Sequence, residues 1–154
     1  MQEVNALNKV AEFHKTFKQP FLEAPGIPSE DRCSLRVALL LEEVKELQQA
    51  IGHKNITEVA DAFCDIQYVL SGAILEFGLG EKFKQLFDEV HRSNMSKACK
   101  TIEEAIQTVE HYKSQKGQDA HFEEDGPFFV VYRTSDHKVL KSINYSPAIL
   151  ATIL

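Results

Sequence analysis

Three features are missing from the sequence, and each absence argues against a class of protein. No apolar run approaches the roughly 20 residues that a transmembrane helix needs, so we do not expect the chain to cross a membrane. Residues 1–20 lack the basic start and apolar stretch of a signal peptide, so we expect a cytoplasmic protein. Cys33, Cys64 and Cys99 are odd in number and widely spaced, which suits neither a disulfide framework nor a CxxC metal site and predicts reduced thiols.

Positive charge is also scarce. The chain has 17 Lys and Arg against 23 Asp and Glu, a formal net charge of −6. Such a chain is not attracted as a whole to nucleic acid or anionic lipid, so we expect neither as a partner, and binding phosphates would require a metal ion or a local basic cluster. With 154 residues, 44% hydrophobic and 26% charged, the composition predicts one globular domain over residues 1–154.

Apolar side chains recur at helical spacing in the first three quarters of the chain. The predicted helices cover about residues 3–18, 30–51, 57–77, 81–96 and 101–115. Ser29 is expected to cap the second helix, and either Asn55 or Thr57 the third.

The last forty residues differ in composition. GPFFVVYR and KVLKSINY are rich in strand-forming residues, and the intervening TSDH predicts a β-hairpin that consists of these two strands. We therefore predict an all-α protein, an antiparallel helical bundle that carries a small C-terminal β-hairpin.

Acidic side chains form one stripe on each of two consecutive helices. With about 100° of rotation per residue, each stripe occupies a narrow arc beside apolar neighbours. The short HKN linker makes the two helices antiparallel neighbours, so the stripes can face each other. The stripes consist of Glu42, Glu43 and Glu46 on the second predicted helix, and Glu58, Asp61 and Asp65 on the third.

Carboxylates that converge beside a core repel one another, and a hard divalent cation relieves this repulsion. Oxygen ligands alone suit Mg²⁺, with Mn²⁺ as the second choice, and substrate phosphates usually complete the coordination. Zinc is not expected here, because no His pair at i, i+4 and no cysteine cluster is present. The alternative is a solvated acidic face with lysine partners, but Lys45 and Lys54 are the only basic residues nearby.

Several segments resemble one known family. EExxE followed by a carboxylate pair on the next helix resembles the MazG-like, all-α nucleoside triphosphate pyrophosphohydrolases, a superfamily that includes phosphoribosyl-ATP pyrophosphohydrolase. One branch has similar D-x-x-x-D-x-x-Y-V, F-x-x-V-H-x-S-N-M-S-K and D-G-K-V-L-K-x-x-N-Y-x-x-P segments, which resemble ADAFCDIQYV, FDEVHRSNMSK and SDHKVLKSINYSP here. Residues 98–123 then form a helical insertion, followed by a C-terminal tail over residues 124–154 that holds the predicted hairpin.

The resemblance implies hydrolysis of a nucleoside triphosphate, or a related nucleotide, to the monophosphate and pyrophosphate. The carboxylates would hold Mg²⁺, and Glu43 or Glu46 would orient or deprotonate the attacking water. Ala62 departs from the wider superfamily, which has a glutamate three residues before Asp65. Either Asp61 with Asp65 or Glu58 with Asp61 takes the role of the pair, and we favour Asp61 with Asp65.

Two polar groups are candidates for binding the nucleotide. The group after the fourth helix can meet phosphate oxygens, but its cations also suit a helix C-terminus. The tail residues can close over a nucleotide, pack on a neighbouring subunit, or face solvent. The candidates are Arg92, Asn94 and Lys97 after the helix, and Lys138, Lys141 and Tyr145 in the tail. Arg32 and Arg36 either bind phosphate or pair with acids.

Three functions follow from these patterns. The first is a Mg²⁺-dependent nucleotide pyrophosphohydrolase, and phosphoribosyl-ATP pyrophosphohydrolase is a narrower alternative. The other alternative is a non-catalytic helical protein with a nucleotide-binding or regulatory role. The departure from the superfamily pattern at Ala62 is the feature that supports this alternative. The family forms dimers or tetramers, so we expect a homodimer or homotetramer.

Overall fold

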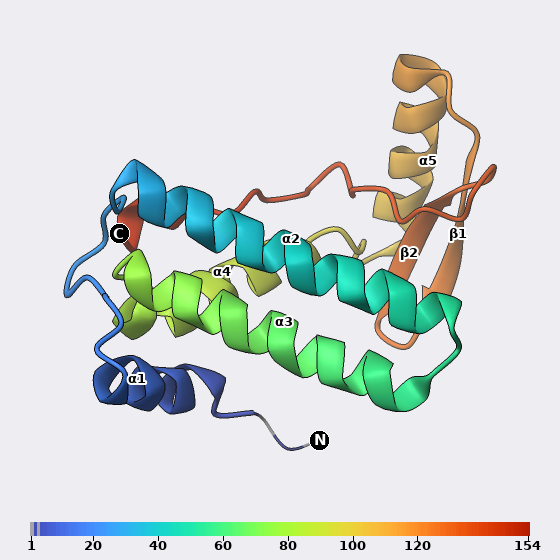
Figure 1. The fold of residues 1–154 in the computed structure, drawn as a ribbon. Helices are drawn as coiled ribbons and strands as arrows, with labels where there is room; N and C mark the ends of the chain where they lie inside the picture. The colour runs from blue at the N-terminus through green and yellow to red at the C-terminus, as the bar shows by residue number, and fades with distance from the viewer. Residues whose placement is uncertain (1, 3) are drawn as a thin grey trace. The chain divides into compact units, whose positions relative to one another are not determined.

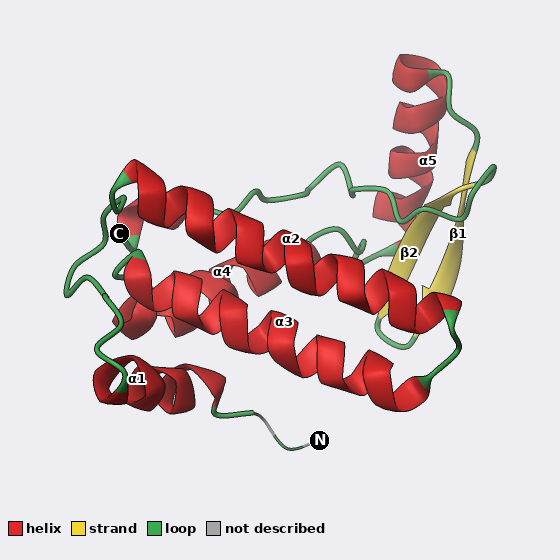
Figure 2. Ribbon diagram, viewed as in Figure 1, coloured by secondary structure: helices red, strands yellow, loops and turns green. Residues whose placement is uncertain are grey.

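Helices dominate the computed structural model, which describes residue 2 and residues 4–154 (Figures 1 and 2). The chain divides into two compact units, Met1–Phe83 and Lys84–Leu154. The predicted fold class, a helical bundle with a small C-terminal hairpin, is confirmed. The prediction of one domain over residues 1–154, with an insertion at 98–123 and a tail at 124–154, stays a prediction.

The first unit contains the helices α1 (Ala6–Thr16), α2 (Glu30–Gly52) and α3 (Ile56–Glu76). A short turn after α2 makes α2 and α3 antiparallel neighbours, and α1 packs against α3 (Figure 1). These bounds agree with the predicted helices to within about three residues. The predicted start of the first helix, at residue 3, lies outside the described residues.

Local side chains explain where the helices begin. The Asn55 side chain accepts hydrogen bonds from the backbone N–H groups of Thr57 (3.1 Å) and Glu58 (3.4 Å), so Asn55 is the N-cap of α3. Ser29 holds the N-cap position of α2, as predicted, but its side chain makes no capping hydrogen bond. The three cysteines are free thiols, also as predicted.

A buried carboxylate ties the three helices of the first unit together. Glu76, at the end of α3, is only 2% exposed. Arg36 of α2 donates a 2.6 Å hydrogen bond to Glu76 Oε1 and a 3.4 Å hydrogen bond to Nε2 of His14 on α1. Arg32, one turn earlier on α2, also hydrogen-bonds to the Glu76 carboxylate. The two arginines therefore pair with an acid, which was one of their two predicted roles.

Two glycines make this packing possible. A Cβ atom at Gly72 would lie 2.9 Å from Nη1 of Arg36, so only glycine leaves room for the guanidinium. Gly78 follows α3 with φ +67°, and a Cβ atom there would collide with the carbonyl oxygen of Ala24. The loop between α1 and α2 can thus return across the end of α3, where the N–H of Leu22 bonds to the carbonyl of Leu75 (3.2 Å).

The second unit combines two helices with a hairpin. The helices are α4 (Phe83–Met95), which begins at the last residue of the first unit, and α5 (Ile102–Lys116). The strands β1 (Ala120–Asp125) and β2 (Phe128–Arg133) pair antiparallel, with Ala120 opposite Arg133 and Asp125 opposite Phe128. α5 packs on both strands. The core of this unit consists of Cys99, Ala105, Val131 and Leu140.

One of the two strands predicted for the hairpin is wrong. GPFFVVYR does contain β2, but its partner is the preceding segment AHFEED, and KVLKSINY makes only an isolated bridge between Val139 and Tyr132. Beside this bridge the N–H of Leu140 bonds to the carbonyl of Val131 in β2 (2.8 Å), but the next two N–H groups bond elsewhere: Lys141 to the hydroxyl of Tyr112 (3.1 Å) and Ser142 to the carbonyl of Lys97 (3.0 Å). These tertiary hydrogen bonds replace a sheet ladder.

Within the described residues, no single helix is long and apolar enough to cross a membrane. Only α3 taken together with the segment Gly80–Met95, across a break between the two, reaches the necessary length and composition.

We predict that Glu76→Gln lowers the free energy of unfolding of the first unit by about 3–5 kcal/mol, because it leaves the buried guanidinium of Arg36 without its counter-charge. Urea unfolding followed by circular dichroism measures the loss. Glu12→Gln, at an exposed position of α1, is the matched control and should change stability by less than about 0.5 kcal/mol. Equal effects of the two variants would contradict the role given to Glu76.

The ionisation of Glu76 should also make the stability of the first unit fall at acidic pH. Burial alone raises the pKa of Glu76, but hydrogen bonds and positive charge from Arg36 and Arg32 outweigh it, so the pKa lies below its ordinary value of 4.5. The stabilisation is therefore complete above about pH 4.5 and is lost as the pH falls through the lowered pKa. The stability difference between wild type and Glu76→Gln should shrink in that range, and a constant difference would contradict the prediction.

Candidate metal and nucleotide site

Five of the six predicted metal ligands lie close together on α2 and α3. The antiparallel pairing brings the second half of α2 beside the first half of α3 (Figure 1). Glu43 is half-buried in this group, and its other four members are exposed. The group, called the acidic cluster below, consists of Glu42, Glu43, Glu46, Asp61 and Asp65.

The pKa of Glu43 shows that the members of the acidic cluster interact. The pKa of Glu43 is raised, first by burial and then by the negative charges of Asp65, Glu46, Glu42 and Asp61, in that order. Asp65, from the opposite helix, has the largest effect of the four. A carboxyl group whose neighbours all raise its pKa is in an environment that a cation would relieve.

No protein cation does so within residues 2 and 4–154. The ion pairs of Lys, Arg and His in this part of the chain involve none of the five carboxylates. Glu76, by contrast, has two arginines. The oxygens of the acidic cluster do not all lie within 4.8 Å of one another, so these exposed side chains must rotate to meet on one ion. An all-oxygen donor set of this kind suits Mg²⁺ or Mn²⁺.

The sixth predicted ligand has a partner of its own. The carboxylate of Glu58 lies 4.0 Å from Nδ1 of His53, and Glu58 is not among the groups with the largest effect on the pKa of Glu43. This arrangement favours Asp61 with Asp65 as the carboxylate pair on α3. Ala62, which stands where the wider superfamily has glutamate, is 4% exposed and belongs to the packed face of α3.

Four of the predicted nucleotide-binding residues meet in the second unit. Lys97 Nζ donates a 2.7 Å hydrogen bond to Oδ1 of Asn94, and Lys141 Nζ lies 4.2 Å from the ring centre of Tyr145. The pKa of Tyr145 is lowered, first by a hydrogen bond from Ser93 and then by the charges of Lys141 and Lys97. The group Asn94, Lys97, Lys141 and Tyr145, called the basic cluster below, is therefore positive and rich in hydrogen-bond donors.

The other two predicted residues have different surroundings. Arg92 donates two hydrogen bonds to Glu89, of 2.7 and 2.8 Å, and further ones to Ser146 and to the carbonyl of Pro147. The hydrogen bonds from Arg92 lower the pKa of Glu89 to about 2. Arg92 thus fastens the tail to α4. Lys138 lies in the turn after β2, where its N–H bonds to Asp136 (3.2 Å).

Sequence reasoning missed one group of possible metal ligands, which consists of His121, Glu123 and His137. Its members are spread over 17 residues, and the strand that carries the first two was not predicted. The alternation His-x-Glu in AHFEED was the only available signal.

Comparison with known proteins identifies a family and a relative that are similar to this chain. Residues 10–94, more than half of the chain, match the protein family described as phosphoribosyl-ATP pyrophosphohydrolase. The chain is also 35% identical over 104 residues to "Uncharacterized protein L479" of Acanthamoeba polyphaga mimivirus. That alignment covers 62% of this chain and 39% of the length of the viral protein.

The family match includes the whole acidic cluster on α2 and α3 together with Asn94, and it ends before Lys97, α5, the hairpin and the tail. The family description names a hydrolase that acts on a nucleotide. The chain belongs to the phosphoribosyl-ATP pyrophosphohydrolase family, within the MazG-like superfamily of nucleotide pyrophosphohydrolases.

Proposed function

We propose that the protein is a Mg²⁺-dependent nucleotide pyrophosphohydrolase, which cleaves a nucleoside triphosphate or a related nucleotide to the monophosphate and pyrophosphate. The observation that carries the proposal is the acidic cluster on the packed pair α2 and α3, whose five carboxylates pair with no cation of residues 2 and 4–154. The charges of the other four also raise the pKa of Glu43. Membership of the family supports the same type of reaction.

In this proposal the acidic cluster holds the metal ion, with Mn²⁺ as a possible substitute for Mg²⁺. Bound Mg²⁺ neutralises charge on phosphate oxygens and polarises an attacking water. Glu43, the half-buried member of the acidic cluster, is one candidate for the base that accepts the proton of this water. Glu46, on the same stripe of α2, is the second candidate.

The basic cluster of the second unit is proposed, by itself, to bind phosphate oxygens. Lys97 and Lys141 supply positive charge, and Asn94 and Tyr145 supply polar groups that fix orientation. That Arg92 and Lys138 also bind the nucleotide stays a prediction. Arg92 supports the basic cluster mainly by holding the tail in place through its hydrogen bonds to Ser146 and Pro147.

The family description favours phosphoribosyl-ATP as one specific substrate to test. The alternative of a non-catalytic protein rests on Ala62, because its methyl side chain has no ligand atom where the wider superfamily has a glutamate. Ala62 is 4% exposed and serves packing instead.

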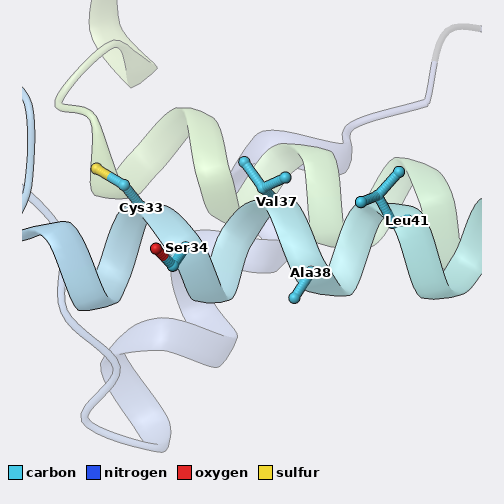
Figure 3. Close-up of a pocket in the computed structure, with 5 residues that line it drawn as sticks. All are labelled: Cys33, Ser34, Val37, Ala38 and Leu41. Carbon is cyan, nitrogen blue, oxygen red and sulfur yellow. The ribbon is translucent and has the colours of Figure 1, made fainter.

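We further propose that the protein forms a homodimer or homotetramer through α2. Val37, Leu41 and Val44 of this helix are 57%, 64% and 51% exposed. Val37 and Leu41 line a shallow apolar groove along the helix, whose other lining residues are Cys33, Ser34 and Ala38 (Figure 3). A run of large exposed apolar side chains is typical of a protein interface, and an identical surface on a second copy is complementary in chemistry.

The first test is pyrophosphate release from ribo- and deoxyribonucleoside triphosphates and from phosphoribosyl-ATP, with and without Mg²⁺. We expect Mg²⁺-dependent release that Glu43→Gln and Asp65→Asn each reduce by about 100-fold or more. Glu12→Gln, at an exposed position of α1, is the control and should keep full activity. Glu58→Gln separates the two candidate pairs, because it should have a small effect if Asp61 and Asp65 form the pair.

Two outcomes would contradict this proposal. Folded protein that binds Mg²⁺ but releases no pyrophosphate from any of these nucleotides would favour the non-catalytic alternative. Release that is unchanged in Glu43→Gln would show that the acidic cluster is not the reaction site.

The proposed interface predicts that Leu41→Glu converts the wild-type oligomer to a monomer, because it places a charge in the apolar face of α2. Light scattering coupled to size-exclusion chromatography measures the mass. Ile27→Glu, at an 84% exposed position in the loop before α2, is the control and should leave the oligomer intact. A wild-type monomer, or an oligomer that survives Leu41→Glu, would contradict an interface at this face.

A further inference from the structure

Two imidazoles and one carboxylate meet at the open end of the hairpin in the second unit. Nε2 of His121 and Nε2 of His137 each lie 3.5 Å from the same oxygen, Oε1 of Glu123. The ligand atoms of the three residues all lie within 4.8 Å of one another. We propose that His121, Glu123 and His137 bind a divalent transition-metal ion of the Zn²⁺ class.

The spacing of these atoms fits a shared cation. Zn²⁺ binds nitrogen and oxygen ligands at about 2.0–2.2 Å, so two ligand atoms on one tetrahedral ion lie about 3.4 Å apart. Well-formed hydrogen bonds from nitrogen to oxygen measure about 2.7–3.2 Å. The two observed separations of 3.5 Å match the first arrangement better than the second.

The hairpin brings the three residues together for simple geometric reasons. His121 and Glu123 are two residues apart on β1, so their side chains lie on the same face of the strand. His137 returns to that face through the turn after β2, which Arg133 and Asp136 close with a 2.6 Å ion pair. The N–H of His137 also bonds to the carbonyl of Arg133 (2.9 Å), and the N–H of Arg133 bonds to the carbonyl of Lys138 (2.9 Å).

Neighbouring groups orient both rings. Nδ1 of His121 lies 3.4 Å from Oγ1 of Thr134, which leaves Nε2 for a metal ion. The ring of His137 lies 4.2 Å, between ring centres, from that of Tyr132. A hydrogen-bond partner on the second ring nitrogen, as Thr134 provides for His121, fixes the tautomer and direction of a histidine ligand, and the Tyr132 ring restricts the orientation of His137 by packing. His137 also has φ +57°, a backbone conformation that is uncommon for residues other than glycine.

The donor set selects the class of metal. Two imidazole nitrogens and one carboxylate oxygen suit Zn²⁺ and related transition metals, whereas Mg²⁺ prefers oxygen ligands alone. Three protein ligands leave a fourth position for water. A bound ion would join β1 to the segment after β2 and so close the open end of the hairpin. This site is chemically different from the acidic cluster and independent of the function proposed for it.

Zn²⁺ binding measured by calorimetry in excess Mg²⁺, which occupies oxygen-only sites, tests the inference. All proteins carry Cys64→Ser, because the exposed thiol of Cys64 is a competing ligand. We expect one Zn²⁺ per chain, with a dissociation constant that His137→Gly raises at least about tenfold. Glycine suits the left-handed backbone at this position, so the variant removes the imidazole without straining the turn. His111→Ala, at an exposed position on α5, is the control and should bind as the parent does.

Co²⁺ provides a second readout, because its visible absorption reports the coordination directly. The parent protein should show the intense bands of a four- or five-coordinate ion, and His137→Gly should lose them. Absence of Zn²⁺ binding by the parent protein, or equal affinity in the parent and His137→Gly, would overturn the proposal and leave Glu123 as an ordinary partner of two surface histidines.

Discussion

The buried ion pair between Glu76 and Arg36 is the interaction on which the first unit depends. A carboxylate that is only 2% exposed is costly to bury, and here two guanidinium groups from α2 compensate for the lost hydration. Arg36 also reaches His14 of α1, so one charged group fixes the relative positions of three helices. Because the pair joins the start of α2 to the end of α3, it helps to set the alignment that brings the two acidic stripes together.

Acidic side chains have opposite electrostatic surroundings at the two ends of the α2 and α3 pair. At one end, arginines neutralise Glu76 and lower its pKa. At the other end, burial and four neighbouring carboxylates raise the pKa of Glu43, and none of these five acids pairs with a cation of residues 2 and 4–154. The first arrangement stabilises the fold by itself, whereas the second is complete only with an ion from solution. This difference separates a structural acid from a candidate functional site more clearly than the pattern EExxE does.

The second unit is held by hydrogen bonds from an irregular tail as much as by its small core. Glu104, Thr108 and Ser142 join α5 to the segment that follows the hairpin, and Arg92 and Ser96 fasten the last residues to α4. The tail is therefore ordered without being a strand. This explains why residues 138–145, despite their strand-forming composition, form no ladder with β2 and instead support the basic cluster.

The sequence by itself determined the five helices, two candidates for the cap of α3 (Asn55 and Thr57) and the family, because helical periodicity, capping side chains and specific motifs act over a few residues. It also determined which residue types make up the acidic cluster. Only the tertiary structure decided that Glu58 lies beside His53, that Arg32 and Arg36 pair with Glu76, that β1 is the partner of β2, and that His121, Glu123 and His137 meet. All but the first of these results depend on contacts between residues distant in sequence, where strand pairing, burial and side-chain direction compete, and no local pattern records the outcome.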